Sequence, residues 1–469
     1  MSKRAVAENV HRAVNYWPCY GGGKETLWSR LASIGGRGWF AHDPSASGGV
    51  RASHPSLESV ADFMREDTVG DYVNHEGVYL QLGKRTGALM GAFVWNTSRG
   101  QACGGIRLRE YASAEDYLRD GLRLAIGMGR KSALAGLWAG GGKGVIAVDP
   151  SRPELCRDPF KRKQMFQDYG DFLSSLRGCY VAAEDAGLNV VDCDTVFSRT
   201  RFMTCIDVTK GGSGNPSVPT AAGVATAIEA ALDFRSKSTV DGKTIAIQGA
   251  GNVARPLMQF LFNLGAKRIV ASDIDPDTLE RARREVVPTS KSQSFELRLA
   301  SPGDLSILSE PCDVLSPCAY GACLTDNTIA ALNCEIVVGA ANNQLADPSN
   351  GDVRIGERGI TYVPDFVANR MGIVNCADEF SGRVGRMGDH MADPIVSRHL
   401  VRGSDWENSV FNITQRVLAE AEAKGLTPGQ AANEMADAMA EERHPIFPGR
   451  SRDIQASLRA EWIEGNESG

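Results

Sequence analysis

The pattern of hydrophobic and polar positions predicts an α/β protein made of two regions. In the first region, apolar runs at residues 79–82 and 89–95 predict two strands joined by a turn that contains glycine. Ser113 then begins a stripe of apolar positions with helical spacing, and the last turn of that helix contains Arg130 and Lys131. Helical spacing returns near the C-terminus, at residues 408–424 and 428–443.

The second region alternates strands with helices. An alanine-rich helix at residues 220–232 precedes a short, continuous apolar strand at 244–248, of the kind that a parallel sheet buries on both faces. Four further short apolar strands follow, at residues 269–272, 313–315, 336–338 and 361–363. This alternation predicts βαβ units and an open α/β sheet.

Residues 1–60 have weak periodicity and many glycines and serines, with glycine runs at 21–23, 35–36 and 48–49. We therefore predict an irregular N-terminal extension at 1–60.

Glycine is in surplus over the whole chain. The 469 residues include 51 glycines, where average usage would give roughly 33. We expect five groups of them to form turns around a cleft, where backbone approaches a ligand without a Cβ in the way. These groups lie at residues 104–105, 140–144, 211–214, 249–251 and 372.

Charge and cysteine spacing exclude several classes of protein. Lys+Arg 51 against Asp+Glu 57 gives a net charge of −6 with no block of like charges, so a nucleic-acid partner is not expected. The longest uncharged run, residues 211–228, contains two prolines and several polar residues, and predicts no membrane span. Eleven cysteines without a C-x-x-C pair, and seven histidines without H-E-x-x-H spacing, predict reduced thiols and no metal site.

The reduced thiols favour a cytoplasmic location. The first 24 residues lack the apolar core of a secretory signal, while Arg4, His11 and Arg12 keep the mitochondrial matrix as the alternative.

A dinucleotide-binding turn follows the strand at 244–248. Gly249, Gly251 and Ala254 form a G-x-G-x-x-A pattern that opens the next helix, and such a helix N-terminus binds a pyrophosphate. Asp273 ends the following strand, 24 residues after Gly249, where a carboxylate accepts hydrogen bonds from ribose hydroxyls. Its neighbours Ile274 and Asp275 offer no positive charge to a 2′-phosphate, which favours NAD over NADP. The alternative is an α/β turn whose glycines serve packing alone.

Lys143 is the candidate base. It lies within Gly140–Gly144 between apolar segments, and removal from water lowers the pKa of an ammonium group. A solvated surface charge is the alternative, and a phosphate-binding loop lacks the required spacing because Gly144 follows the lysine. Asp185 follows a predicted strand at residues 179–181 and gains a role only with a lysine partner, since it can otherwise cap a helix or turn.

Seven motifs, in order, resemble the glutamate/leucine/phenylalanine/valine dehydrogenase family, most closely its leucine dehydrogenase branch. The resemblance covers residues 78–443, and its carriers are Gly104-Gly105-Ile106-Arg107, the segment 140–146, Ala183-Glu184-Asp185, the segments 213–217 and 249–254, the segment 339–345, and Asn375-Cys376-Ala377-Asp378-Glu379.

The resemblance implies a reversible oxidative deamination. An L-amino acid, NAD+ and water would give a 2-oxo acid, ammonium and NADH. Lys131 would bind the substrate α-carboxylate, Lys143 would act as general base on water, and Asp185 would shuttle protons at the amino group. The other substrate-binding positions would be Gly105, Asn343, Ile373 and Cys376, and the cofactor-binding positions Thr220, Gly249, Gly251, Asn252, Val253, Asp273, Ala340 and Asn342.

The resemblance also implies the substrate class and the domains. Glutamate-specific members have a lysine and a serine at the positions of Cys103 and Cys376, so a neutral apolar substrate of the leucine, valine or isoleucine type is expected here. An aromatic amino acid dehydrogenase and a non-catalytic NAD-binding regulator are the alternatives, and bulky Arg370 and Met371 are expected near the pocket mouth. We expect a homo-oligomer with a substrate and oligomerisation domain at residues 61–210 plus 372–469, and a Rossmann-type domain at 211–371.

Overall fold

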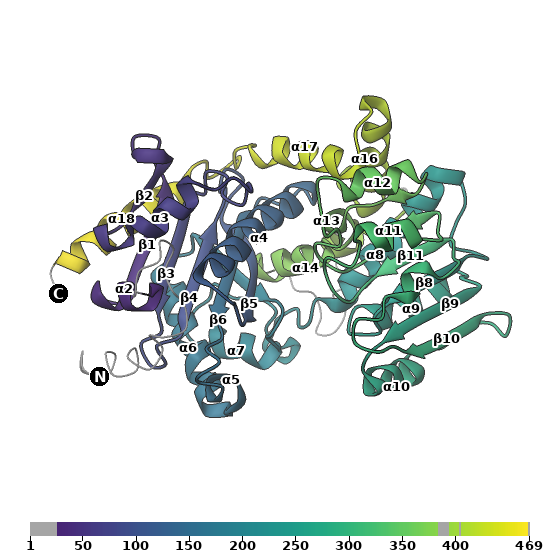
Figure 1. Ribbon diagram of the computed structural model, residues 1–469, viewed down its shortest axis with the longest axis horizontal. Helices are drawn as coiled ribbons and strands as arrows, with labels where there is room; N and C mark the ends of the chain where they lie inside the picture. Colours follow the sequence, from purple (N-terminus) through teal and green to yellow (C-terminus); the bar gives the residue numbers. More distant parts are fainter. Residues whose placement is uncertain (1–25, 383–393, 403–404, 468–469) are drawn as a thin grey trace.

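The computed structural model describes residues 26–382, 394–402 and 405–467. Figure 1 shows two α/β bodies side by side, each organised around its own sheet. Between them lie helices α4 (Ala114–Leu134), α13 (Asp365–Ala368) and α14 (Met371–Phe380). Two sheets joined in this way confirm the predicted fold class.

The first sheet has seven strands in the order β2-β1-β3-β4-β6-β5-β7. Strands β5, β6 and β7 run parallel to one another, while the pairs from β2 to β6 are antiparallel. The strands are β1 (Arg37–His42), β2 (Val50–Ala52), β3 (Gly77–Leu82), β4 (Leu89–Val94), β5 (Ala102–Arg109), β6 (Gly140–Ala147) and β7 (Tyr180–Glu184). The helices of this body are α2 (Leu27–Ser33), α3 (Glu58–Arg65), α4 (Ala114–Leu134), α5 (Glu154–Arg157), α6 (Pro159–Ser175) and α7 (Val190–Phe197).

Helix α4 connects the sheet to the cleft. It begins as predicted, because the Ser113 side chain accepts a hydrogen bond from the Asp116 amide, and it brings Lys131 to its last turn. Its apolar face, including Tyr117, Leu118 and Leu122, is buried in the core of the first body.

The prediction of an irregular extension is wrong for residues 26–60. Strand β1 pairs with β3 and extends the sheet, and Trp39 and Phe40 are buried. The elements are only three to eight residues long and are separated by glycines 35, 36, 48 and 49 with positive φ. Such short runs contain too few positions to display a period. Residues 1–25 lie outside the described residues.

The glycines of residues 104–105 and 140–144 were expected in turns, and this is also wrong. They lie inside β5 and β6, where the backbone packs tightly against neighbouring elements. A Cβ on Gly141 would lie 2.4 Å from the Ala125 carbonyl oxygen of α4, and one on Gly104 would lie 1.8 Å from the Gly142 carbonyl oxygen. Gly372, similarly, lies in a helix rather than a turn.

The second sheet is wholly parallel, with strand order β10-β9-β8-β11-β12-β13. This is the doubly wound order of a dinucleotide-binding domain. The strands are β8 (Thr244–Gln248), β9 (Arg268–Asp273), β10 (Ser294–Leu299), β11 (Val314–Pro317), β12 (Ile336–Val337) and β13 (Thr361–Tyr362). The helices are α8 (Ser217–Ser236), α9 (Ala254–Asn263), α10 (Pro276–Glu285), α11 (Asp326–Ala331), α12 (Gly351–Glu357) and α13 (Asp365–Ala368).

The C-terminal helices are shared between the two bodies, so the predicted return of all of residues 372–469 to the first domain is wrong in part. Val410, Ile413 and Val417 of α16 join the core of the second body, against α8. Helix α17 packs on α4, and α18 packs on β1. These helices are α14 (Met371–Phe380), α15 (Pro394–Ser397), α16 (Val410–Lys424), α17 (Pro428–Ala440) and α18 (Arg450–Glu467).

Two buried or half-buried charges secure two of the points where the chain crosses between the bodies. The Glu379 carboxylate accepts hydrogen bonds from the amides of Cys205 (2.8 Å) and Ser213 (2.9 Å) on the first crossing. At the second crossing, Arg370 is fully buried and donates 2.8 Å hydrogen bonds to the carbonyl oxygens of Leu134 and Asn408. Burial lowers the pKa of Arg370 to about 9. Arg370 therefore connects the end of α4 to the start of α14, away from the position at the pocket mouth that we expected.

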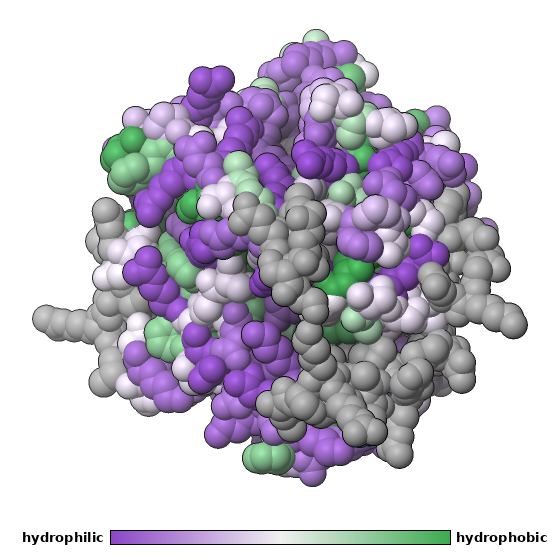
Figure 2. All heavy atoms as spheres, turned by 90° about the vertical axis from the view of Figure 1, so that its left-hand side faces the viewer, coloured by the Kyte–Doolittle hydropathy of each residue, from purple (hydrophilic) through white to green (hydrophobic). Residues whose placement is uncertain are grey.

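The outer face of the first body, seen in Figure 2, is mainly hydrophilic with scattered hydrophobic patches. Among the described residues, no helix is both long enough and apolar enough to cross a membrane.

Candidate active site

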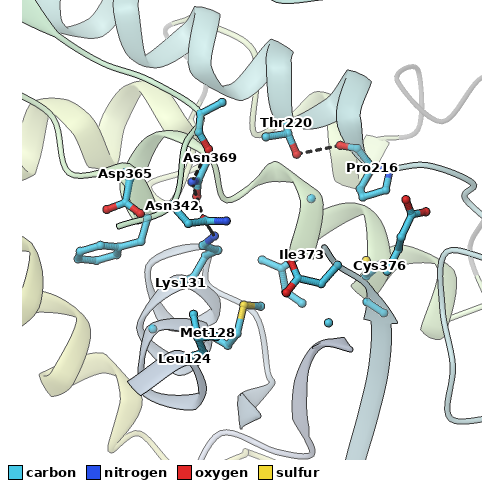
Figure 3. Close-up of a pocket in the computed structure, with 18 of the residues that line it drawn as sticks. Leu124, Met128, Lys131, Pro216, Thr220, Asn342, Asp365, Asn369, Ile373 and Cys376 are labelled. Atoms are coloured by element: carbon cyan, nitrogen blue, oxygen red, sulfur yellow. Dashed lines mark hydrogen bonds between the residues drawn. The ribbon is translucent and has the colours of Figure 1, made fainter. Parts of the chain in front are cut away.

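The cleft between the two bodies contains a pocket of about 280 Å³. Helix α4, the middle of β5 and β6, and the end of β7 form one wall, and α8, α13, α14 and the loop after β12 form the other. Figure 3 shows Lys131, Asn342 and Asn369 meeting across this space, with Met128 and Leu124 below them on α4 and with Ile373 and Cys376 on the opposite side.

A buried ion pair lies on the first-domain wall. Lys143 Nζ is 2.5 Å from Asp185 Oδ2, and the Lys143 side chain is only 4% exposed. Burial lowers the pKa of Lys143 although Asp185 opposes that change. Burial alone would raise the pKa of the Asp185 carboxyl, but Lys143 and Arg107 hold it well below its usual range. An amine and a carboxylate at this distance can exchange a proton, which is the requirement for general acid and base catalysis.

Lys131 provides a second amine that faces the other domain. Its Nζ is 3.4 Å from Asn342 Oδ1, which also accepts a 2.9 Å hydrogen bond from Asn369. Burial lowers the pKa of Lys131 to about 8, with Asp365 opposing and Lys143 adding to that change. A cation placed here can bind a carboxylate.

The dinucleotide turn lies beside the pocket. Gly249 has φ +92°, a left-handed conformation that favours glycine, and a Cβ on Gly251 would point into open space. The Ala250 amide donates a 2.8 Å hydrogen bond to Asp273 Oδ2 at the end of β9. This arrangement fits a dinucleotide, because the backbone is free to approach a pyrophosphate and the Asp273 carboxylate lies where ribose hydroxyls would arrive.

The structure brings most of the predicted site residues to one place. The pocket is lined by Gly105, Lys131, Lys143, Asp185, Thr220, Val253, Ala340, Asn342, Asn343, Ile373 and Cys376. The remaining four, Gly249, Gly251, Asn252 and Asp273, do not line it and instead form the adjacent turn and strand end. Their individual roles stay predictions.

The sequence did not single out Asp365 or Asn369 as site residues. Asp365 accepts a 2.9 Å hydrogen bond from the Asn343 amide and faces Lys131, and Asn369 orients Asn342. Its position in the sequence could have indicated Asp365, because it follows β13 and lies at the carboxyl edge of a parallel sheet, where ligands bind.

A second cavity, of about 390 Å³, adjoins the first and shares Ala183, Ile373 and Cys376 with it. Cys103 and Leu137 contribute to its walls. Met371, which we expected at the mouth of the pocket, is fully buried and packs against Gly223 of α8 instead.

Comparison with known proteins accounts for this arrangement. The family described as "Glutamate/Leucine/Phenylalanine/Valine dehydrogenase" matches residues 211–441, and the one described as "Glu/Leu/Phe/Val dehydrogenase, dimerisation domain" matches residues 87–202. The chain belongs to the glutamate/leucine/phenylalanine/valine dehydrogenase family. It is therefore an amino acid dehydrogenase by family, which confirms the predicted resemblance.

Relatives within the amino acid dehydrogenase family cover most of the chain. The leucine dehydrogenase of Geobacillus stearothermophilus is 39% identical over 310 residues, 66% of this chain and 79% of the relative. The valine dehydrogenase of Streptomyces coelicolor is 33% identical over 386 residues, which are 82% of this chain and 97% of the relative. Among solved structures, L-tryptophan dehydrogenase from Nostoc punctiforme superimposes with a TM-score of 0.61 and 27% identity, covering 82% of this chain and 98% of that one.

Proposed function

We propose that this protein catalyses the reversible NAD-dependent oxidative deamination of a neutral, apolar L-amino acid of the leucine, valine or isoleucine type. The products would be the 2-oxo acid, ammonium and NADH. The observation that supports this proposal is the buried Lys143–Asp185 pair, which lies in the cleft with Lys131 and next to a dinucleotide-binding turn.

In this proposal each charged group has a separate task. Protonated Lys131 binds the substrate α-carboxylate and fixes the position of the Cα atom. Neutral Lys143 removes a proton from the water that attacks the Cα carbon after its oxidation, and Asp185 transfers protons to and from the amino group. The close approach of Lys131, Lys143 and Arg107 favours the neutral form of the base, because like charges disfavour one another in a site with little water.

The proposed cofactor is NAD. Bound NAD supplies the hydride acceptor for the substrate Cα. Gly249 and Gly251 would let the backbone approach its pyrophosphate, and Asp273 would accept hydrogen bonds from the adenosine ribose. A 2′-phosphate in NADP would meet the Asp273 carboxylate, which opposes its binding.

The preference for an apolar side chain rests on the adjoining cavity. Cys103 and Cys376 line it where glutamate-specific relatives carry polar anchors, and Ala183, Leu137 and Ile373 add apolar surface. A substrate carboxylate buried among these five residues would lack the polar anchors of the glutamate-specific relatives, at a cost of several kcal/mol. Arg398 also lines the cavity, with its guanidinium 3.9 Å from the centre of the Trp406 ring. An aromatic amino acid is the second candidate, supported by the size of this cavity.

The experiment is an assay of NADH formation by the purified full chain with a panel of L-amino acids, using NAD and NADP in parallel. We expect turnover with leucine, valine or isoleucine and NAD, and none with glutamate. Faster turnover with phenylalanine or tryptophan would select the aromatic alternative. NADH binding without turnover of any amino acid would reject the enzymatic proposal and favour a regulator.

We also propose a homo-oligomer in a reducing compartment, the cytoplasm. The match of residues 87–202 to a dimerisation domain supports the first point. The ten cysteines that the structure describes are free thiols, which supports the second.

A further inference from the structure

Arg107 belongs to the Gly104-Gly105-Ile106-Arg107 motif, and so far only the effect of its positive charge on Lys143 and Asp185 has been considered, not its hydrogen bonds. Its Nε donates to Asp185 Oδ2 at 3.2 Å, and its Nη1 donates to both carboxylate oxygens of Asp120, at 3.1 and 3.2 Å. The side chain of Arg107 is 12% exposed and that of Asp120 only 3%. Arg107 therefore bridges two carboxylates inside the first domain, on the wall of the cleft.

Asp120 is itself held from two further sides. The Tyr111 hydroxyl donates a 2.7 Å hydrogen bond to Asp120 Oδ2, and Arg123 Nη2 is 3.6 Å from Asp120 Oδ1. Lys143 and Arg107 converge on the same oxygen, Asp185 Oδ2. The result is a continuous chain of polar contacts from Tyr111 through Asp120, Arg107 and Asp185 to the Lys143 amine.

We infer that Arg107 is a positioning residue, which holds the Asp185 carboxylate against Lys143 and, together with Asp120, sets the charge balance that decides when the Lys143 amine is free to accept a proton. This inference rests on the proposed function, because it concerns the same proton transfer. Arg107 acts through Asp185 and Lys143, and the proposed reaction gives it no contact with the attacking water or the substrate Cα.

The charges around the Lys143–Asp185 pair come from every neighbouring element. Two of them oppose each other at Lys143: the positive charge of Arg107 lowers the pKa of Lys143, and the negative charge of Asp120 raises it. The other titratable groups are present in every variant below, so their titration is common to all of them. They are Lys131 and Arg123 from α4, Glu184 from β7, whose pKa is raised to about 7 by burial, and Asp365 from α13.

Removing either charge should therefore move the pH dependence in a known direction. In Arg107→Gln the pKa of Lys143 rises, so the pH at which neutral Lys143 becomes available rises too. The acid limb of kcat/KM for deamination should move up by about one pH unit, and the rate on that limb should fall on the order of tenfold at fixed pH. Ionisation of the substrate amine is common to all variants and does not contribute to the difference.

Asp120→Asn supplies the opposite sign. Loss of the negative charge lowers the pKa of Lys143, and the acid limb should move down by roughly 0.3 to 0.5 pH unit. Arg107→Lys keeps the positive charge and should keep the limb within about 0.3 unit of wild type, with a lower kcat because one ammonium cannot make the same forked contacts.

The matched control is Arg85→Gln. Arg85 also bridges two carboxylates, the buried Asp168 at 2.9 Å and Asp171 at 2.8 Å, at a site outside the pocket. This variant should leave the pH profile where it is. A purely structural role for Arg107 predicts that Arg107→Gln, like Arg85→Gln, changes stability or rate equally at every pH.

A second readout does not depend on turnover. The rate at which acetic anhydride labels Lys143 in the apo-protein follows its neutral fraction, and mass spectrometry over a pH series gives its titration midpoint. We expect the midpoint to rise in Arg107→Gln and to fall in Asp120→Asn. Unchanged midpoints in both folded variants would overturn the inference.

The two proposals fail in distinguishable ways. If wild type forms no NADH with any amino acid, the proposed function fails whatever the labelling shows. If wild type turns over and the profiles of Arg107→Gln and Asp120→Asn both superimpose on it, only the role of Arg107 is rejected. If Arg107→Gln does not fold, the opposite shift in Asp120→Asn still decides the question.

Discussion

Two glycine-rich segments face the cleft from opposite domains, and they use glycine for opposite reasons. In β6, Gly141 has no room for a Cβ, because the Ala125 carbonyl oxygen and the Gly129 backbone of α4 would lie 2.4 to 2.9 Å away. At the turn after β8, a Cβ on Gly251 would meet nothing within 4 Å. The first segment uses glycine to bring a helix onto a strand and so fixes Lys143, while the second leaves space that a ligand can fill.

The difference shows how the two sides of the cleft divide their work. The first-domain side contains charged groups that are buried and paired, with Lys143 only 4% exposed. The nucleotide side presents backbone amides and two carboxylates, Asp273 and Asp365, at the ends of parallel strands. Substitutions on the first side should therefore affect chemistry and folding, and those on the second side should affect cofactor binding.

The largest effect should come from Lys143→Ala. Loss of the general base should reduce kcat about 10²- to 10⁴-fold, while the Kd for NADH stays within about twofold of wild type because the nucleotide turn is untouched. Lys161→Ala, at a half-exposed lysine paired with Glu154 on the surface, is the control. Activity close to wild type in Lys143→Ala would exclude this residue from the mechanism. It would also contradict the assignment of chemistry to the first-domain side of the cleft.

The next effect concerns folding. Gly141→Ala forces a methyl group against the backbone of α4, and we expect it to lower the free energy of unfolding by about 1–3 kcal/mol, measured by chemical denaturation. A stability equal to that of wild type would mean that α4 moves freely on β6, contrary to the packing described above.

Gly251→Ala is the matched change on the other side. The added methyl group meets open space, so the free energy of unfolding should change little, while the Kd for NADH should increase roughly tenfold because the methyl group occupies the path of the pyrophosphate. Calorimetric titration with NADH provides the measurement. If this variant were destabilised and bound NADH normally, the two glycine segments would have the same purpose.

The smallest effect is a pH dependence of substrate binding. Lys131 has its pKa lowered to about 8 by burial, so it loses its positive charge, and its attraction for the α-carboxylate, as the pH rises through that value. The KM for the amino acid should rise severalfold between pH 7 and 9. Lys131→Arg keeps its charge over this range. The KM of this variant should therefore stay constant between pH 7 and 9, even if its value is higher than that of wild type. An equal rise of KM in both proteins would assign the effect to another group.

The sequence was informative where chemistry and spacing coincide. The turn from Gly249 to Asp273 was predicted because strand, glycines, helix and carboxylate follow one another within a single βαβ unit. Asp185 was predicted to gain a role only with a lysine partner, and Lys143 is that lysine, with its Nζ 2.5 Å from Asp185 Oδ2. Both cases depend on short motifs whose meaning is carried by neighbouring residues.

The failures have equally specific causes. The β6 glycines have no side chains and therefore no hydrophobic pattern, so a buried strand resembled a loop. Arg370 is buried because Leu134 and Asn408, which are distant in the sequence, both offer it carbonyl oxygens, and no local pattern contains that information. The bridge from Asp120 to Asp185 through Arg107 likewise depends on β5 lying between two other strands and below α4.

The charges at the two crossings also have a mechanical consequence. Glu379 holds the outgoing segment at Cys205 and Ser213, and Arg370 holds the returning segment at Leu134 and Asn408. Both charged residues belong to the segment around α14. This helix therefore lies at a hinge, with one body on each side of it. We expect the cleft to open by rotation about α14, with the largest travel at the ends of the domains farthest from it and almost none at Cys376.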